Sequence, residues 1–167
     1  MVTLTAGSLF SGIGGVDLAL ESLGFQVLWQ CDSDPCARAV LAAHWPGVRL
    51  YEDVREIDAR AARVSLLCGG FPCQGHSVAG KRKGTADPRW LWPEFARIIG
   101  ALRPGLVFIE NVPGLRTSGL RDVLADLAAL GFDAEWGVFS AAEVGAPHIR
   151  RRLFILAYSN GDFLREQ

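Results

Sequence analysis

The chain has 167 residues, of which 50% are hydrophobic and 21% are charged. This composition is typical of a globular protein and excludes a disordered one, and the length suffices for one domain with its own core. The formal net charge of −1 excludes a protein that binds nucleic acid through an overall positive charge, so basic contacts must be local.

Short apolar runs alternate with helical patterns along the chain. Strands are expected at residues 7–12, 25–32, 48–53, 64–70, 105–112, 133–141 and 152–159. Helices are expected where apolar residues recur at i, i+3, i+4 and i+7, at residues 16–23, 36–43, 95–102 and 120–127. Asp34 and Pro35 should begin the second helix. We expect the apolar face of that helix to carry Cys36, Ala39, Val40 and Ala43.

This alternation predicts an α/β fold, a doubly wound and mostly parallel sheet with helices on both faces. In such sheets, ligands bind outside the carboxyl ends of the strands. The unusual segments of this sequence follow strands directly: FSGIGG (10–15), CDSD (31–34), GGFPCQ (69–74) and ENVPG (110–114). We therefore expect the functional site at this edge of the sheet.

The sequence also bears on location. No apolar run approaches the roughly 20 residues that cross a bilayer, and the first residues lack the basic region of a secretory signal. The four cysteines occur without a secretory context, which indicates a reducing compartment. We expect a cytoplasmic protein, of bacterial or phage type, without membrane contact.

The glycine-rich turn after the first strand has the spacing G-x-G-G. Its glycines would let a ligand approach the backbone at a helix N-terminus, although a simple tight turn would need them as well. Asp32 follows the second strand, where a carboxylate usually binds ribose hydroxyls, and Asp53 follows the third. Together they favour a cofactor that contains adenosine; the alternative role for such residues is helix capping.

Cys73 lies in the glycine-rich segment GGFPCQG. A thiol can serve as a buried hydrophobic group, a disulfide partner, a metal ligand or a nucleophile. Cys31/Cys36 and Cys68/Cys73 are both C-x₄-C pairs, but zinc sites prefer shorter spacings, and a disulfide does not fit a reducing compartment. We expect no metal site, and the loop position of Cys73 favours nucleophilic chemistry.

Two further segments carry charged groups in unusual places. Glu110 ends a strand that is otherwise apolar, where partial burial would raise the pKa of its carboxyl group. The alternative is that Glu110 pairs with an arginine. Arg150 and Arg152 are two residues apart and should lie on one face of the last strand. They suit an anion or an electron-rich ring, or they form a solvated edge that discourages strand pairing.

Six segments, taken in order, resemble the cytosine-5 DNA methyltransferase family. They are LFSGIGGVDLALESLGF (9–25), CDSDPCARAVLAAHWP (31–46), YEDVREI (51–57), LLCGGFPCQGHSVAGKRKG (66–84), LVFIENVPGL (106–115) and EVGAPHIRRRLFILA (143–157). The resemblance covers the chain to about Ser159. GFPCQ is moderately specific by itself, and the ENV and R-x-R segments downstream make the match specific.

The resemblance implies the Rossmann-like fold of methyltransferases that use S-adenosyl-L-methionine, as well as a restriction-modification context. Asp32 would bind the ribose hydroxyls, Asp53 the adenine amino group and Val54 another edge of the adenine, while Pro72 and Gln74 would shape the cysteine loop. The implied cofactor loop is Phe10, Gly12, Ile13, Gly14 and Gly15, with Phe10 packing on the adenine.

The resemblance also implies the reaction. Cys73 would add to C6 of a cytosine flipped out of double-stranded DNA, and C5 would then accept the methyl group. Glu110 would contact N3 of the base, and Arg150 and Arg152 would assist at the base and the cysteine loop. Residues Lys81–Lys83 would be available for phosphates, unless they belong to a solvated loop.

The chain departs from the family at two points. His148 stands where the family usually has glutamine. The target-recognition region and the C-terminal segment of the family have no counterpart, so we expect a catalytic and cofactor-binding domain at 1–159 and a polar tail at 160–167. A second polypeptide, or self-association, would supply the missing parts. The alternatives are a cofactor-binding remnant without turnover of its own and an RNA cytosine methyltransferase.

Overall fold

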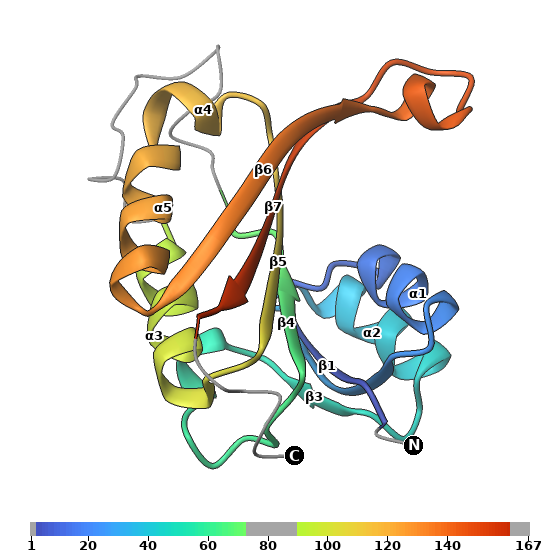
Figure 1. Cartoon of the computed structure of the whole chain (residues 1–167). Helices are drawn as coiled ribbons and strands as arrows, with labels where there is room; N and C mark the ends of the chain where they lie inside the picture. The colour runs from blue at the N-terminus through green and yellow to red at the C-terminus, as the bar shows by residue number, and fades with distance from the viewer. Residues whose placement is uncertain (1–2, 73–89, 161–167) are drawn as a thin grey trace.

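A computed structural model describes residues 3–72 and 90–160 of the chain. This part forms a seven-stranded sheet with the order β3-β2-β1-β4-β5-β7-β6 (Figure 1). The strands are β1 (Thr5–Leu9), β2 (Gln26–Cys31), β3 (Arg49–Tyr51), β4 (Leu66–Gly69), β5 (Leu106–Asn111), β6 (Phe132–Ser140) and β7 (Arg151–Ser159).

The first five strands of the chain run parallel, and β7 is antiparallel to both of its neighbours, β5 and β6. The helices are α1 (Gly15–Ser22), α2 (Pro35–His44), α3 (Trp92–Leu102), α4 (Leu115–Ser118) and α5 (Leu120–Ala129), with 3₁₀ turns η1 (Val54–Glu56) and η4 (Ala141–Val144). The predicted doubly wound, mostly parallel sheet is confirmed. Each expected strand and helix is present, and α4, η1 and η4 are additional.

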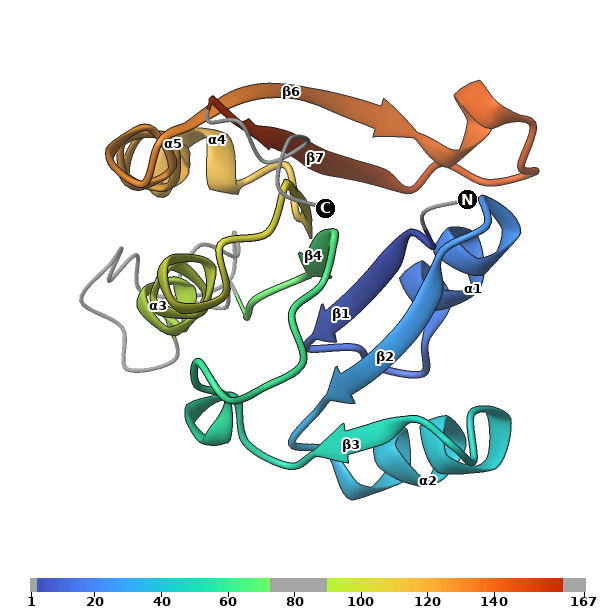
Figure 2. The same cartoon turned by 60° about the horizontal axis from the view of Figure 1, so that its bottom comes forward.

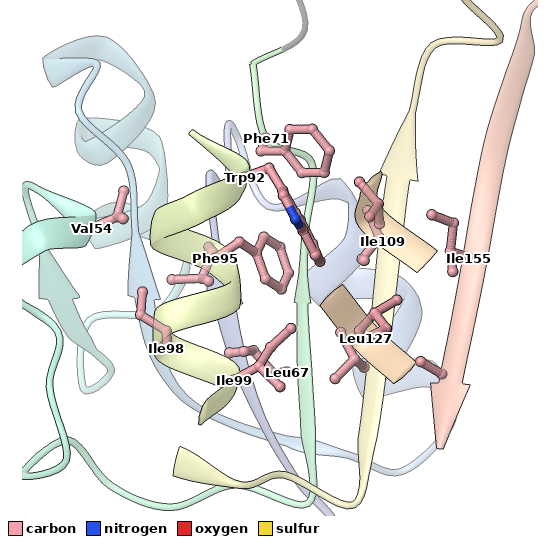
Figure 3. Packing of buried hydrophobic residues seen from close by; sticks show 14 of the residues in the cluster. Val54, Leu67, Phe71, Trp92, Phe95, Ile98, Ile99, Ile109, Leu127 and Ile155 are labelled. Carbon is pink, nitrogen blue, oxygen red and sulfur yellow. The ribbon is translucent and has the colours of Figure 1, made fainter. Parts of the chain in front are cut away.

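Helices cover both faces of the sheet, with α1 and α2 on one side and α3 and α5 on the other (Figures 1 and 2). The larger core lies beneath α3 and α5. Phe95, Ile98 and Ile99 of α3 are fully buried there in one cluster with Leu67 of β4 and Ile109 of β5, and Figure 3 shows Ile99 beside Leu67. Each such side chain contributes on the order of 1.5–3 kcal/mol on burial, so this layer fixes the central strands on which the site is built.

The α2 helix begins as predicted but faces the other way. Asp34 Oδ1 accepts a 2.7 Å hydrogen bond from the Cys36 N–H, and Pro35 is the first helical residue. The predicted apolar face is wrong, because Cys36 is exposed and Val40 is 45% exposed. The helix instead buries its other apolar stripe: Ala37, Leu41 and the Trp45 that follows.

On the face of the sheet that α1 covers, several apolar side chains of β6 and β7 remain exposed to solvent. Tyr158 and Leu156 of β7 are 40% and 43% exposed, and Phe139 of β6 is 53% exposed. Cross-strand pairing sets Leu156 beside Phe108 of β5, so an apolar strip runs over β5 and β7. In the described ranges, 3–72 and 90–160, no helix is long and apolar enough to cross a membrane.

Candidate active site

A cavity of about 710 Å³ opens at the carboxyl ends of β1, β4 and β5. One wall is the turn after β1 and the start of α1, and the opposite wall comes from β5, the end of β6, η4 and β7. It is therefore where the sequence predicted a ligand site. Its lining residues include Phe10, Gly12, Ile13, Gly15, Gly69, Gly70, Glu110, Phe139, Val144, Arg150 and Arg152.

The turn after β1 has an unusual backbone. Phe10 has a φ of 53°, in the left-handed region that a bulky residue rarely adopts, and Gly12 has a φ of 56°. Strained residues of this kind are typical of ligand-binding turns. Gly14 has a φ of 86° and does not line the cavity. A Cβ there would collide with the Trp45 ring, so Gly14 lets α2 pack closely behind the turn.

Asp32 fixes this turn from the end of β2. Its Oδ2 accepts a 2.7 Å hydrogen bond from the Gly12 N–H, and its Oδ1 accepts a 2.9 Å hydrogen bond from the Asp34 N–H. Ser11 adds a second link to β2, because its N–H donates to the Cys31 carbonyl at 3.0 Å. Asp32 is thus beside the predicted cofactor loop, although it does not line the cavity.

Asp53 and Val54 lie at η1, outside the cavity lining. Asp53 caps this turn by accepting the Arg55 N–H at 2.9 Å, and that backbone hydrogen bond, followed by the Arg55 side chain, lowers the pKa of its carboxyl group. Capping was the alternative role that the sequence left open. The Val54 side chain is buried in the larger core, and Pro72 is half-buried outside the lining.

Three described residues were predicted to act on the base, and two of them, Glu110 and Arg152, form an ion pair on the opposite wall of the cavity. Arg152 Nε lies 2.5 Å from Glu110 Oε1, and both side chains are largely shielded, at 23% and 30% exposure. Arg150 lines the same cavity from an exposed position, although it precedes β7, which begins at Arg151, and so is not within the last strand as the spacing predicted. The structure therefore shows the alternative that the sequence left open for Glu110, a carboxylate paired with arginine.

Glycine at position 70 makes room for this carboxylate. A Cβ on Gly70 would lie 3.0 Å from Glu110 Oε2 and 3.1 Å from the Glu110 carbonyl oxygen. Those distances are tighter than ordinary van der Waals contact, so a side chain at position 70 would displace Glu110. The end of β4 and the end of β5 are therefore fitted to each other at the cavity.

Cys73, Gln74 and Lys81–Lys83 lie outside the described residues. The described chain stops at Pro72, two residues beyond the cavity-lining Gly70. Of the other thiols, Cys31 and Cys68 are buried, and burial is the main cause that raises the pKa of each to about 12. Neither is suited to nucleophilic chemistry.

A buried polar cluster beneath the turn was not anticipated. Asp17 of α1 is fully buried and accepts hydrogen bonds from Ser8 Oγ at 3.1 Å and from Gln30 Nε2 at 3.0 Å. Ser8 also lines the cavity. The available signal was an acidic residue, Asp17, between the apolar residues Val16 and Leu18 in the first turn of a helix.

Comparison with known proteins identifies the family. The family model described as C-5 cytosine-specific DNA methylase matches residues 4–166. The chain belongs to that family. Two curated relatives are the Type II methyltransferases M.MspI of Moraxella sp., 32% identical over 159 residues, and M2.BsuMI of Bacillus subtilis (strain 168), 35% identical over 159 residues. These matches cover 91% and 90% of this chain but 38% and 41% of the relatives.

Solved structures agree with the fold. The Spodoptera frugiperda DNMT2 mutant has a TM-score of 0.79 at 23% identity, with 95% of this chain and 50% of that chain covered. The S. pombe Dnmt2 methyltransferase has a TM-score of 0.78 at 24% identity, with 95% and 51% covered. This cytosine-5 methylase chain thus has the methyltransferase fold and spans about two fifths to one half of these proteins.

The family uses S-adenosyl-L-methionine, and the cavity of this family member suits that group. A Cβ on Gly12 or Gly15 would meet nothing within 4 Å, so both glycines leave open space at the cavity wall. Gly15 and Val16, the first residues of α1, line this space, and the N–H groups in the first turn of a helix have no partner one turn earlier. They can bind an anionic or polar group of a ligand.

Proposed function

We propose that this chain is the catalytic part of a DNA cytosine-5 methyltransferase. The observation that carries the proposal is the cavity itself, which is bounded by the glycine turn on one side and by Glu110 and Arg152 on the other. It lies at the end of β4, and the chain continues from there toward Cys73. A donor held on one wall would face a base held on the other.

The first wall would hold the cofactor. Phe10, Gly12, Ile13 and Gly15 would contact it directly, Gly14 and Asp32 would keep the turn in shape, and Pro72 would shape the neighbouring loop. Asp32 and the capped Asp53 present carboxylate oxygens that can accept from hydroxyl and amino groups, and Val54 borders Asp53. When bound, S-adenosyl-L-methionine supplies a methyl group attached to positively charged sulfur.

The second wall and the cysteine loop would act on the base. The Cys73 thiolate adds to C6 of the flipped-out cytosine, which forms the S–C6 bond and places an electron pair on C5. That pair would accept the methyl group that bound S-adenosyl-L-methionine supplies, as the bond from the methyl group to sulfur breaks and its electrons stay on sulfur. A base would then remove the C5 proton, and the released electrons would re-form the C5–C6 double bond as the thiolate leaves. Glu110 would share a proton with N3 and so offset the negative charge on the ring.

The arginines would organise this wall. Arg152 holds the Glu110 carboxylate through its Nε, so Glu110 must shift toward the base to share a proton with it. Arg150 stays exposed at the cavity and can stabilise the ring or the cysteine loop. Residues 1–159 would form this catalytic unit, and 160–167 a polar tail.

We further propose that the unit works with a second polypeptide that supplies target recognition, or with another copy of itself. The support is the apolar strip on β5 and β7 with Leu156 and Tyr158 in solvent, and its continuation along the cavity as Phe139 and the 80% exposed Val144. The exposure of these cavity-lining residues also favours one alternative, a module that binds the cofactor weakly and has no turnover alone.

A reconstitution assay tests the proposal. Transfer of a labelled methyl group to cytosine-containing duplex DNA is measured with the full chain alone, and then with the C-terminal part of a relative added. We expect activity only in the mixture and its loss in Cys73→Ser, whereas Cys36→Ser, which alters an exposed thiol on α2, keeps it. Cofactor binding without any methyl transfer in the mixture would favour the cofactor-binding module without turnover. Full activity of Cys73→Ser would refute the assignment of Cys73 as the nucleophile.

A further inference from the structure

Asn111, at the end of β5, has a buried side-chain amide whose nitrogen and oxygen both form hydrogen bonds. It is 4% exposed. Its Nδ2 donates to the Phe71 carbonyl oxygen at 3.1 Å, and its Oδ1 accepts from the Val112 N–H at 2.8 Å. The two partners fix the orientation of the amide, because only its nitrogen can face a carbonyl oxygen. No role for this side chain follows from the proposed chemistry.

The hydrogen bond from Asn111 lies where the sheet ladder stops. The last paired residues of β4 and β5 are Gly69 and Ile109. Two residues further along each strand, the same register would set Phe71 opposite Asn111. The side-chain amide therefore supplies a link between the two strand ends beyond the last backbone pair.

Both strand ends are anchored on their other sides. Asn111 pairs with Leu153 of β7. The Phe71 ring is 2% exposed and lies 5.2 Å from the Trp90 ring and 5.5 Å from the Trp92 ring, centroid to centroid, within the core shown in Figure 3. The main chain two residues before Cys73 is thus held by its side chain in the core and by its carbonyl group on Asn111.

We infer that Asn111 is a positioning residue that sets the start of the cysteine segment against Glu110. This inference rests on the proposed function, because it matters only if Cys73 and Glu110 act on the same base. Glu110 directly precedes Asn111, and the fit of Gly70 to the Glu110 carboxylate needs the same alignment of the two strand ends. A misplacement of about 1 Å between reacting groups can cost on the order of 100-fold in rate.

The test compares Asn111→Ala and Asn111→Asp with Ser65→Ala in the reconstituted assay. Ser65 is a matched control at the opposite end of β4, where its Oγ accepts a 3.2 Å hydrogen bond from the Thr5 N–H. We expect both Asn111 variants to lower kcat by about 30- to 100-fold, with the KM for S-adenosyl-L-methionine within twofold, because the first wall is unchanged. Ser65→Ala should keep kcat within threefold at a similar loss of thermal stability.

A kcat within threefold of the parent in both Asn111 variants overturns the inference and leaves the proposed function standing. If Asn111→Ala does not fold, the equally sized Asn111→Asp decides, since it loses the donor to Phe71. If the parent mixture shows no transfer, the proposed function fails, and hydrogen exchange of the full chain decides the link instead. Faster exchange of the Phe71 N–H in Asn111→Asp but not in Ser65→Ala supports the coupling, and equal exchange refutes it.

Discussion

Arg152 and Glu110 form an ion pair across neighbouring antiparallel strands, with Nε 2.5 Å from Oε1, and both line a cavity that the glycine turn after β1 also lines. The pair explains how an acidic residue can end a strand whose other residues are apolar. It also means that Glu110 has a partner before any base arrives. Exchange of that partner for the base is the step that the proposed chemistry requires of this wall.

Glu110→Gln should separate chemistry from cofactor binding. The amide keeps the size of the side chain but cannot share an acidic proton, so methyl transfer in the reconstituted assay should fall by about 10²- to 10⁴-fold. Binding of S-adenosylhomocysteine, measured by isothermal titration, should stay within twofold. Glu135→Gln, at an exposed position on β6, serves as the control. A variant at position 110 that kept more than a tenth of the parent rate would contradict the role of this carboxyl group.

Asp58, five residues after Asp53, makes the same type of local contacts, so the two positions can be compared directly. Asp53 accepts the Arg55 N–H at 2.9 Å and pairs with its side chain, and Asp58 does the same with Arg60. Asp53→Ala should weaken S-adenosylhomocysteine binding by about tenfold through loss of one hydrogen bond to a charged group. Asp58→Ala loses an equivalent cap without that contact, so its affinity should be unchanged. Equal effects would show that only local capping is lost.

Thiol reactivity should divide the cysteines into two classes. Burial raises the pKa of Cys31 and Cys68 to about 12, so their thiolate fraction at pH 8 is on the order of 10⁻⁴. Iodoacetamide should therefore leave both unmodified in the folded chain and modify both after unfolding, as mass spectrometry can show. Cys36 is exposed and should react, and Cys73 should react fastest if it is the nucleophile. Modification of Cys36 with none at Cys73 would argue against that role.

The sequence predicted the fold well because the pattern of apolar residues is set by burial against the sheet. The predicted buried face of α2 was wrong because that helix carries two apolar stripes. The buried stripe is the one that continues into the large Trp45, whose ring packs against Gly14. Only packing between distant segments makes that choice.

The site was predicted less completely, and the reason is spatial. Residues that line the cavity, such as Gly12 just after β1 and Glu110 near the end of β5, lie at strand ends and could be found from that position alone. The ion pair with Arg152 depends on the antiparallel insertion of β7 beside β5, and the hydrogen bond from Asn111 to Phe71 depends on the register of two parallel strands. Neither relationship has a local signature in the sequence.

The buried Asp17 should make stability depend on pH in a direction opposite to that of most carboxylates. Burial raises the pKa of its carboxyl group from the ordinary value of 3.8, against the lowering effect of the hydrogen bonds from Gln30 and Ser8. The folded state therefore holds a proton at pH values where the unfolded state has released it. The stability contributed by this proton is full below about pH 3.8 and is lost as the pH rises through the higher folded value.

Asp17→Asn removes this dependence while it keeps the size of the side chain and a hydrogen-bond acceptor for Ser8. The free energy of unfolding is measured by urea titrations at several pH values between 4 and 7. As the pH rises, the parent should lose stability relative to Asp17→Asn, because only the parent loses the contribution of the Asp17 proton. Asp122→Asn, at an exposed position on α5, provides the control and should leave the pH dependence of the parent unaltered. A constant difference between parent and Asp17→Asn across this range would mean that Asp17 is ionised throughout. Its hydrogen bonds from Ser8 and Gln30 would then outweigh its burial.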